Sequence, residues 1–77
     1  MNMEELYGSA VGERIRSLRE NSGLRQEDLA REFGLANGTV ISNYESARRH
    51  LPTEVAVAYS RKFGVSTDWI LTGKEAG

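Results

Sequence analysis

Apolar residues recur at intervals of three and four positions along most of the chain, which is the spacing of one buried helix face. Val11, Ile15 and Leu18 form the first such set, and Leu29 with Phe33 belongs to the second. No stretch alternates polar and apolar residues for long enough to indicate a strand. The pattern therefore predicts five short helices, at about 9 or 12 to 22, 25 to 33, 38 to 46, 52 to 63 and 67 to 72.

Capping and turn residues mark the ends of these segments. Asn37 and Ser66 have side chains that accept hydrogen bonds from the free N–H groups of a first helical turn, and Pro52 suits a first turn because its missing N–H is not needed there. Glycine, which readily adopts the left-handed conformation of many helix C-termini, follows four of the helices at positions 23, 34, 64 and 73. We expect an all-α, compact bundle over 9–73, with short tails at 1–8 and 74–77.

The composition restricts the chemistry that the chain can carry. Its 77 residues include no cysteine and one histidine, His50, so disulfides and thiolate metal sites are excluded. With no nucleophile–base pair and no glycine-rich phosphate loop, an enzyme is not expected, nor is a cofactor, metal or small-molecule ligand. The longest apolar run, 55–59, is too short to cross a membrane, and the N-terminus lacks a signal-peptide pattern. The bacterial cytoplasm is the expected compartment.

Charge is distributed unevenly along the chain. The formal net charge is −1, which by itself disfavours a nucleic-acid ligand, because neutralised phosphates supply most of the affinity of such proteins. Between 37 and 51, however, the charged residues are Glu45, Arg48 and Arg49 alone. The arginine pair is either solvated surface or a pair of phosphate contacts beside the third helix. Its place directly after that helix favours the second interpretation.

Residues 26–49 have the layout of a helix-turn-helix, whose second helix enters the major groove of DNA. Ala30 is small enough for the two helices to cross closely, and Gly34 tolerates the positive φ that the turn needs. Ile41 and Tyr44 lie three positions apart and form the inner face of the second helix. Tyr44 is therefore expected in the core and not as a stacking surface for bases.

These residues, with the segments GERIRSLRENSGLRQEDLA and GVSTDWILTG, resemble the Cro and phage-repressor family of helix-turn-helix regulators. The resemblance covers 12–73, and so many coinciding features are more specific than a helix-turn-helix pattern alone. It implies a lambda-repressor-like fold with the second and third helices as the helix-turn-helix. It also implies a sequence-specific DNA-binding transcriptional regulator, a phage or prophage repressor or Cro-like protein, that binds a palindromic operator as a homodimer.

The chain departs from the family pattern by one extra residue between Gly34 and Tyr44. If the extra residue is assigned to the turn, the match to the family pattern buries Ile41 and Tyr44. If the chain is matched to the pattern without a gap, Val40 and Asn43 are buried instead. An unpaired buried amide costs about 1 to 3 kcal/mol, so we expect the longer turn.

Three further positions differ from the family. Gly38 lies in the first turn of the third helix, where the family often has a long polar reader, so we expect specificity to shift to neighbouring side chains or to a close backbone approach. Ala47 replaces the usual glycine after that helix, and Leu51 replaces the usual proline before the next. These two changes are expected to alter the shape of the loop between the third and fourth helices.

Outward positions of the third helix are the candidates for base readout. Asn43 ranks first, because its amide can donate to and accept from adenine; the alternative is an ordinary solvent-facing asparagine. Val40 can meet a thymine methyl group, and the two hydroxyls can bind a base edge or a phosphate. The set is Thr39, Val40, Ser42 and Asn43.

Phosphate contacts, which fix register without encoding sequence, are expected at both ends of the motif. Gln26 begins the second helix, where its side chain and the free N–H groups can face the same anion, a role that the resemblance also implies. Glu45 is expected to pair with Arg48 or Arg49 without touching a base. The phosphate set is Arg25, Gln26, Asn37, Arg48, Arg49 and His50.

A domain of this size reaches a single half-site, and two-fold symmetry doubles that contact. The dimer surface is expected at Trp69, Ile70 and Leu71, with a place in the core as the alternative for Trp69. Double-stranded DNA and a second copy are thus the expected partners, with no membrane. The alternative function is an antitoxin or protein-docking module of the same fold, which the near-neutral charge also allows.

Overall fold

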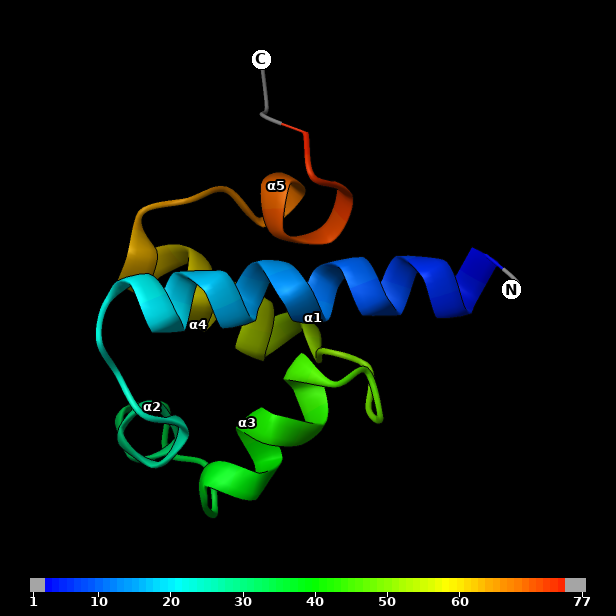
Figure 1. Cartoon of the computed structure of the whole chain (residues 1–77). Coiled ribbons are helices and arrows are strands. Elements are labelled where there is room, and N and C mark those ends of the chain that lie inside the picture. Colours follow the sequence, from blue (N-terminus) through cyan, green and yellow to red (C-terminus); the bar gives the residue numbers. More distant parts are fainter. Residues whose placement is uncertain (1–2, 75–77) are drawn as a thin grey trace.

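A computed structural model describes residues 3–74, and within them the chain forms five α-helices and no strand (Figure 1). The all-α prediction is therefore confirmed. The helices are α1 (Met3–Asn21), α2 (Gln26–Glu32), α3 (Gly38–Glu45), α4 (Thr53–Phe63) and α5 (Thr67–Thr72).

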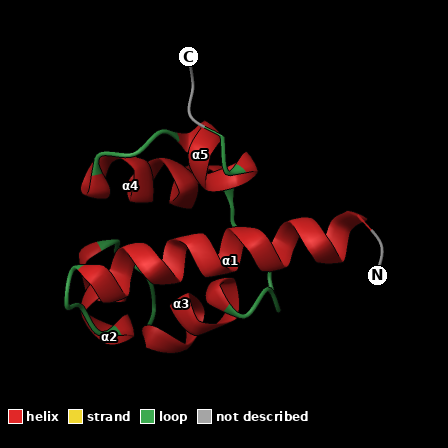
Figure 2. Cartoon of the chain, turned by 45° about the horizontal axis from the view of Figure 1, so that its top comes forward, coloured by secondary structure: helices red, strands yellow, loops and turns green. Residues whose placement is uncertain are grey.

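The longest helix, α1, separates the other four into two pairs. Figure 2 shows α2 and α3 on one side of α1 and α4 with α5 on the other. Helix α1 contacts both α3 and α5, while α2 packs on α3 and α4 packs on α5. The predicted helix-turn-helix is thus one distinct half of the molecule, and α1 is the element that supports it.

Each helix contributes one large, fully buried side chain to a single core. These side chains have a relative exposure of 0%, and burying one of them stabilises the fold by about 1.5 to 3 kcal/mol. They are Ile15, Leu29, Ile41, Tyr59 and Ile70. The core therefore fixes the position of α3 through its inner face and leaves the opposite face of α3 for other contacts.

The start of the first helix differs from its prediction. We expected it at 9 or 12, but α1 begins at Met3, so residues 3–8 are helical and continue α1. Gly8 and Gly12 lie within the helix, because an interior glycine costs only about 1 kcal/mol relative to alanine and does not end a helix. Residues 1, 2 and 75–77 of the expected tails lie outside the described residues, and the division into tails and domain stays a prediction.

The predicted caps are confirmed. The side chain of Asn37 accepts a hydrogen bond from the Thr39 N–H at 3.0 Å, and that of Ser66 accepts one from the Trp69 N–H at 2.9 Å. All four glycines that follow helices have positive φ, between 68° and 77°. Ala47, at the place where the family usually has glycine, also has a positive φ of 62°.

Replacing Ala47 with glycine is expected to raise the free energy of unfolding by about 0.5 to 1 kcal/mol. The left-handed conformation costs an L-residue about 1 to 2 kcal/mol, and the greater freedom of glycine in the unfolded chain offsets part of that gain. Urea denaturation measures the change. The matched control is Ala36→Gly, because Ala36 is exposed and does not have a positive φ. This control variant is expected to lose stability. A similar loss of stability in Ala47→Gly would contradict the argument.

Tyr59 places a hydroxyl in the core without a hydrogen-bond partner among the described residues. Its ring packs edge-on against the Phe33 ring, with 5.0 Å between the ring centroids, and stacks with the Phe63 ring at a centroid distance of 6.0 Å. Burial raises the pKa of this hydroxyl above its usual value. The ring therefore stabilises the core while its polar atom opposes burial.

Tyr59→Phe is expected to raise the free energy of unfolding by about 1 kcal/mol, because it keeps the ring contacts and removes an unpaired polar group whose burial costs about 1 to 3 kcal/mol. Chemical denaturation tests this directly. Tyr59→Leu, which removes the hydroxyl and both ring contacts, is expected to lose stability. Loss of stability in Tyr59→Phe would show that the hydroxyl has a stabilising partner.

Candidate nucleic-acid interface

The turn between α2 and α3 places the two helices in close contact. Ala30 is fully buried, and its carbonyl accepts a hydrogen bond from the Leu35 N–H at 2.8 Å across Gly34, whose φ is 71°. The predicted turn glycine is confirmed, and Ala30 is buried as a small contact residue would be.

Gly38 serves a purpose that the sequence analysis missed. It is buried against α2, and a Cβ atom there would lie 2.9 Å from Glu27 Oε2 and 3.0 Å from the Glu27 backbone N. Gly38 lies in the first turn of α3, as expected, and it faces α2. Its missing side chain lets the start of α3 approach that helix.

The inner face of α3 is the one that the longer turn predicts. Ile41 is fully buried and Tyr44 is 7% exposed, whereas Val40 and Asn43 are only half-buried. The choice of the longer turn, and of Tyr44 as a core residue, is confirmed. The outer side of α3 has an exposed Thr39 beside the half-buried Val40, Asn43 and Ser42.

The first turn of α3 is capped by the protein itself. Glu27 Oε2 accepts a hydrogen bond from the Gly38 N–H at 2.8 Å, and Asn37 Oδ1 accepts one from the Thr39 N–H. The carboxylate of Glu27 also lies at the positive end of the α3 dipole, which favours a negative charge. Asn37 therefore uses its oxygen within the protein, and its amide nitrogen is the group that can donate to a phosphate.

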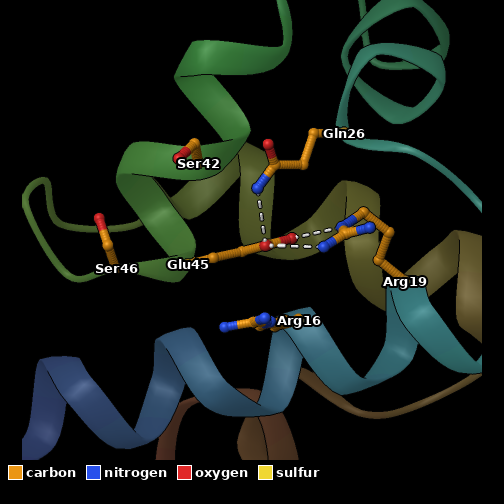
Figure 3. A pocket seen from close by; sticks show the side chains of 6 residues that line it. All are labelled: Arg16, Arg19, Gln26, Ser42, Glu45 and Ser46. Carbon is orange, nitrogen blue, oxygen red and sulfur yellow. Dashed lines mark hydrogen bonds and ion pairs between the residues drawn. The ribbon is translucent and has the colours of Figure 1, made fainter.

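An ion pair connects α1 to the end of α3 (Figure 3). Glu45 Oε2 lies 2.7 Å from Arg19 Nε, and Glu45 Oε1 lies 3.0 Å from Arg19 Nη2, with side-chain exposures of 5% and 12%. The hydrogen bond to Glu45 raises the pKa of the Arg19 guanidinium, which burial alone would lower. The expected pairing of Glu45 with Arg48 or Arg49 is wrong, because the carboxylate points under α3 toward α1.

Arg19 is thus a residue that the sequence analysis overlooked. Its only local signal is its place one turn after Ile15, at the edge of the buried face of α1. The partner is 26 positions away, so no local pattern could identify it.

Gln26 is held by the same carboxylate. Its Nε2 donates to Glu45 Oε1 at 3.1 Å, and Figure 3 shows its carbonyl oxygen directed away from the ion pair. Because a carboxylate only accepts hydrogen bonds, Glu45 determines which end of the amide faces inward. Gln26 is therefore fixed between α2 and α3 with its carbonyl oxygen and its second N–H available.

The expected basic contacts lie at both ends of the motif. Arg48, Arg49 and His50 are exposed in the loop after α3, where the backbone N–H groups of the two arginines donate to the Asn43 carbonyl at 3.0 and 3.2 Å. Arg25 is exposed before α2, and its Nε lies 3.0 Å from Asp28 Oδ2 in an ion pair. The hydrogen bonds that Arg25 donates lower the pKa of the Asp28 carboxyl. Such exposed pairs are weak, so Arg25 can exchange its partner.

The expected dimer surface is partly wrong. Ile70 is fully buried in the core, and its carbonyl accepts a hydrogen bond from Arg14 Nε at 2.8 Å, so its side chain is not available to a second copy. Trp69 and Leu71 are half-buried and pack against the core. The bulky side chain of Trp69 thus has a core contact, and part of it remains accessible.

Residues 3–74 contain no group of three or more His, Cys, Asp or Glu side chains that could hold a metal ion. Over the same residues, no helix is both long and apolar enough to span a membrane.

The chain is similar to several characterised proteins. The helix-turn-helix domain family matches residues 12–76. The chain is 41% identical over 66 residues to the repressor protein CI of Enterobacteria phage phi80, and 32% identical over 66 residues to the HTH-type transcriptional regulator ImmR of Bacillus subtilis (strain 168). Each match covers 86% of this chain but 27% and 50% of those proteins. The chain therefore spans between about a quarter and half of the length of these relatives.

A solved structure has the same arrangement of helices. The crystal structure of the P22 c2 repressor protein in complex with the synthetic operator 9T matches with a TM-score of 0.75 and 31% identity, over 83% of this chain and 96% of that chain. The similarity thus includes the helix pair α2–α3 together with the supporting helices.

Proposed function

Because the chain belongs to the helix-turn-helix domain family, we propose that it is a sequence-specific DNA-binding transcriptional regulator that acts as a repressor in the bacterial cytoplasm. The observation that carries the proposal is the division of α3 into two faces. Ile41, Tyr44 and Glu45 attach it to the protein, while Thr39 and Asn43 lie one turn apart on its other side. A helix held in this way can enter the major groove as a rigid element.

Base readout in this proposal belongs to Thr39, Val40, Ser42 and Asn43. The amide of Asn43 can make the paired donor and acceptor contact with adenine that discriminates against other bases by about 1 to 3 kcal/mol. The half-buried Val40 offers methyl groups at the edge of the same surface, where a thymine methyl can meet them.

Phosphate contacts flank this reading surface on two sides. Gln26 is oriented by Glu45 at the start of α2, and the exposed side chains of Arg48, Arg49 and His50 follow α3. Arg25 and Asn37 complete the set. These groups attach to the two backbone strands that border a groove, and they determine register rather than sequence.

The regulator is proposed to act as a homodimer on a palindromic operator whose half-sites are centred about 10 to 10.5 base pairs apart. With Ile70 in the core, the accessible parts of Trp69 and Leu71 are the remaining candidates on α5 for contact between copies. Sedimentation of the protein with and without operator DNA measures the stoichiometry.

Asn43→Ala and Arg49→Gln are expected to affect DNA binding differently. Loss of the Asn43 amide removes base discrimination, so binding to the operator should weaken about 5- to 150-fold while binding to unrelated DNA stays unchanged. Loss of the Arg49 charge should weaken binding to all sequences and lower the salt slope by about 1. The operator is defined by selecting bound oligonucleotides from a random pool, and affinities are then measured by fluorescence anisotropy with competitor DNA.

Two outcomes would contradict the proposal. Equal binding of the unmodified protein to every sequence at about 150 mM salt would remove the claim of specificity, since specific sites are typically bound at least 1,000-fold more tightly. Retention of full biological activity by both variants, together with co-purification of a protein encoded next to this one, would indicate a docking module instead.

A further inference from the structure

A polar hollow of about 180 Å³ lies between α1, α2 and the C-terminal half of α3. Figure 3 shows that side chains from all three helices border it. The lining contains two guanidinium groups, one carboxylate, one amide and two hydroxyls, and no apolar side chain. The residues are Arg16, Arg19, Gln26, Ser42, Glu45 and Ser46.

The charges of the hollow do not cancel. Arg19 binds both oxygens of Glu45, so this pair is internally neutral. Arg16 adds a second guanidinium whose side chain is 60% exposed and whose ion-pair partner, Glu20, lies 3.4 Å away with 53% exposure. An exposed pair one turn apart on a helix is weak. A doubly hydrogen-bonding anion can therefore take the place of Glu20 at the Arg16 guanidinium.

Neutral donors stand on the opposite wall of the hollow. Ser42 on α3 and Ser46, the residue directly after that helix, lie one turn apart, and both line the hollow. The Ser46 hydroxyl makes a long hydrogen bond of 3.4 Å to the Asn43 carbonyl, which a phosphate oxygen can replace. Gln26 Nε2 donates one hydrogen to Glu45, and an amide nitrogen has a second one to donate. A guanidinium held only in a weak, exposed ion pair, facing hydroxyl and amide donors, matches the donor set that binds a phosphate group.

The hollow also borders the proposed reading surface. Ser42 follows Thr39 by three positions on α3, and Ser46, directly after the helix, follows Asn43 by three, so the two sets lie side by side along the helix axis. A duplex that meets Thr39 and Asn43 thus brings one backbone strand past the hollow. Arg16 is the α1 residue of the lining whose guanidinium is not held by Glu45.

We propose that this hollow binds a phosphate group, with Arg16 as its charged contact and Ser42 and Ser46 as hydroxyl donors. Under the proposed function, on which this part of the inference rests, the group is one phosphate of the DNA backbone beside the reading helix. The three helices then contact the duplex together. Helix α1 contributes a direct contact to the ligand and also supports α3.

The first experiment measures how DNA affinity depends on salt for Arg16→Gln. Loss of one phosphate contact is expected to lower the slope of log K against log[salt] by about 0.9, and to weaken binding to operator and unrelated DNA by the same factor. The matched control is Arg61→Gln, which removes the same charge from the exposed side of α4. The contact with the DNA backbone would be overturned if Arg16→Gln had the same salt slope as the unmodified protein. It would also be overturned if Arg16→Gln and Arg61→Gln lowered the slope equally.

The second experiment needs no DNA and separates the hollow from the proposed function. Inorganic phosphate is titrated into the protein at constant ionic strength, with chloride as the comparison, and the NMR shifts of the Ser42 and Ser46 amides are followed. Phosphate-specific shifts that disappear in Arg16→Gln support the site even if the protein binds no DNA. Shifts that are identical in chloride, or unchanged in Arg16→Gln, would overturn it.

Discussion

Replacing Glu45 with alanine is expected to lower the free energy of unfolding by about 1.5 to 3 kcal/mol, because it removes the charged acceptor of two hydrogen bonds from the part-buried guanidinium of Arg19, which still donates to the Leu24 carbonyl. The side chains of the pair are 5% and 12% exposed, and the two contacts of 2.7 and 3.0 Å join α1 to α3. Small domains have a total stability of about 5 to 15 kcal/mol. Urea denaturation of this variant should therefore show a large shift of the midpoint.

A double variant provides the control for this prediction. Replacing both Arg19 and Glu45 with leucine removes both charges at once, and such apolar replacements of buried pairs are often neutral or stabilising. The double variant is therefore expected to be more stable than Glu45→Ala. A loss below about 1 kcal/mol in Glu45→Ala, as for a surface pair, would show that the pair does not hold α1 and α3 together.

The same substitution should also alter the reading surface. Glu45 is the group that accepts from Gln26 and orients its amide, and the ion pair fixes the end of α3. In any fraction of Glu45→Ala that remains folded, binding to all DNA sequences is expected to weaken, because a proposed phosphate contact loses its fixed position.

Gly12→Ala is expected to lower the free energy of unfolding by about 2 kcal/mol and to displace α3. A Cβ atom at this position would lie 2.3 Å from the Glu45 carbonyl oxygen and 3.0 Å from that of Tyr44. Both atoms belong to backbone, which cannot move without moving the helix. Overpacking costs about 1 to 3 kcal/mol or more, and the better helix propensity of alanine recovers about 1 kcal/mol at most.

Ser17→Ala separates the two contributions, because it changes an exposed position of the same helix to the same residue. This control is expected to keep or slightly raise stability. Thermal unfolding of both variants, with NMR shifts of the α3 amides as a readout of its displacement, tests the prediction. Equal stability of Gly12→Ala and the unmodified protein would show that α1 and α3 can separate at no cost.

Local features of the chain predicted most of the fold because they act over a few residues. The three- and four-residue spacing of apolar positions predicted the helices, and Asn37, Ser66 and the four glycines predicted where they begin or end. Even the orientation of α3 followed from a local argument, since burying Asn43 in place of Ile41 would have left an amide unpaired.

Apart from the start of α1, the errors concern contacts between distant segments. Gly12 and Gly38 both proved to be points of close helix contact, although a glycine in a sequence does not reveal which neighbour it admits. Ile70 lies in the core and its neighbours Trp69 and Leu71 lie at its edge, but three consecutive apolar residues cannot indicate which one faces inward.

The sequence by itself determined the helices, their caps, the helix-turn-helix and the inner face of α3, because hydrogen bonding and side-chain periodicity within one segment are enough to specify them. The tertiary structure alone decided the partner of Glu45, the orientation of Gln26 and the hollow beside Arg16. Electrostatic pairing depends on distance in space, and α1 and the end of α3 become neighbours only when the core has packed them together.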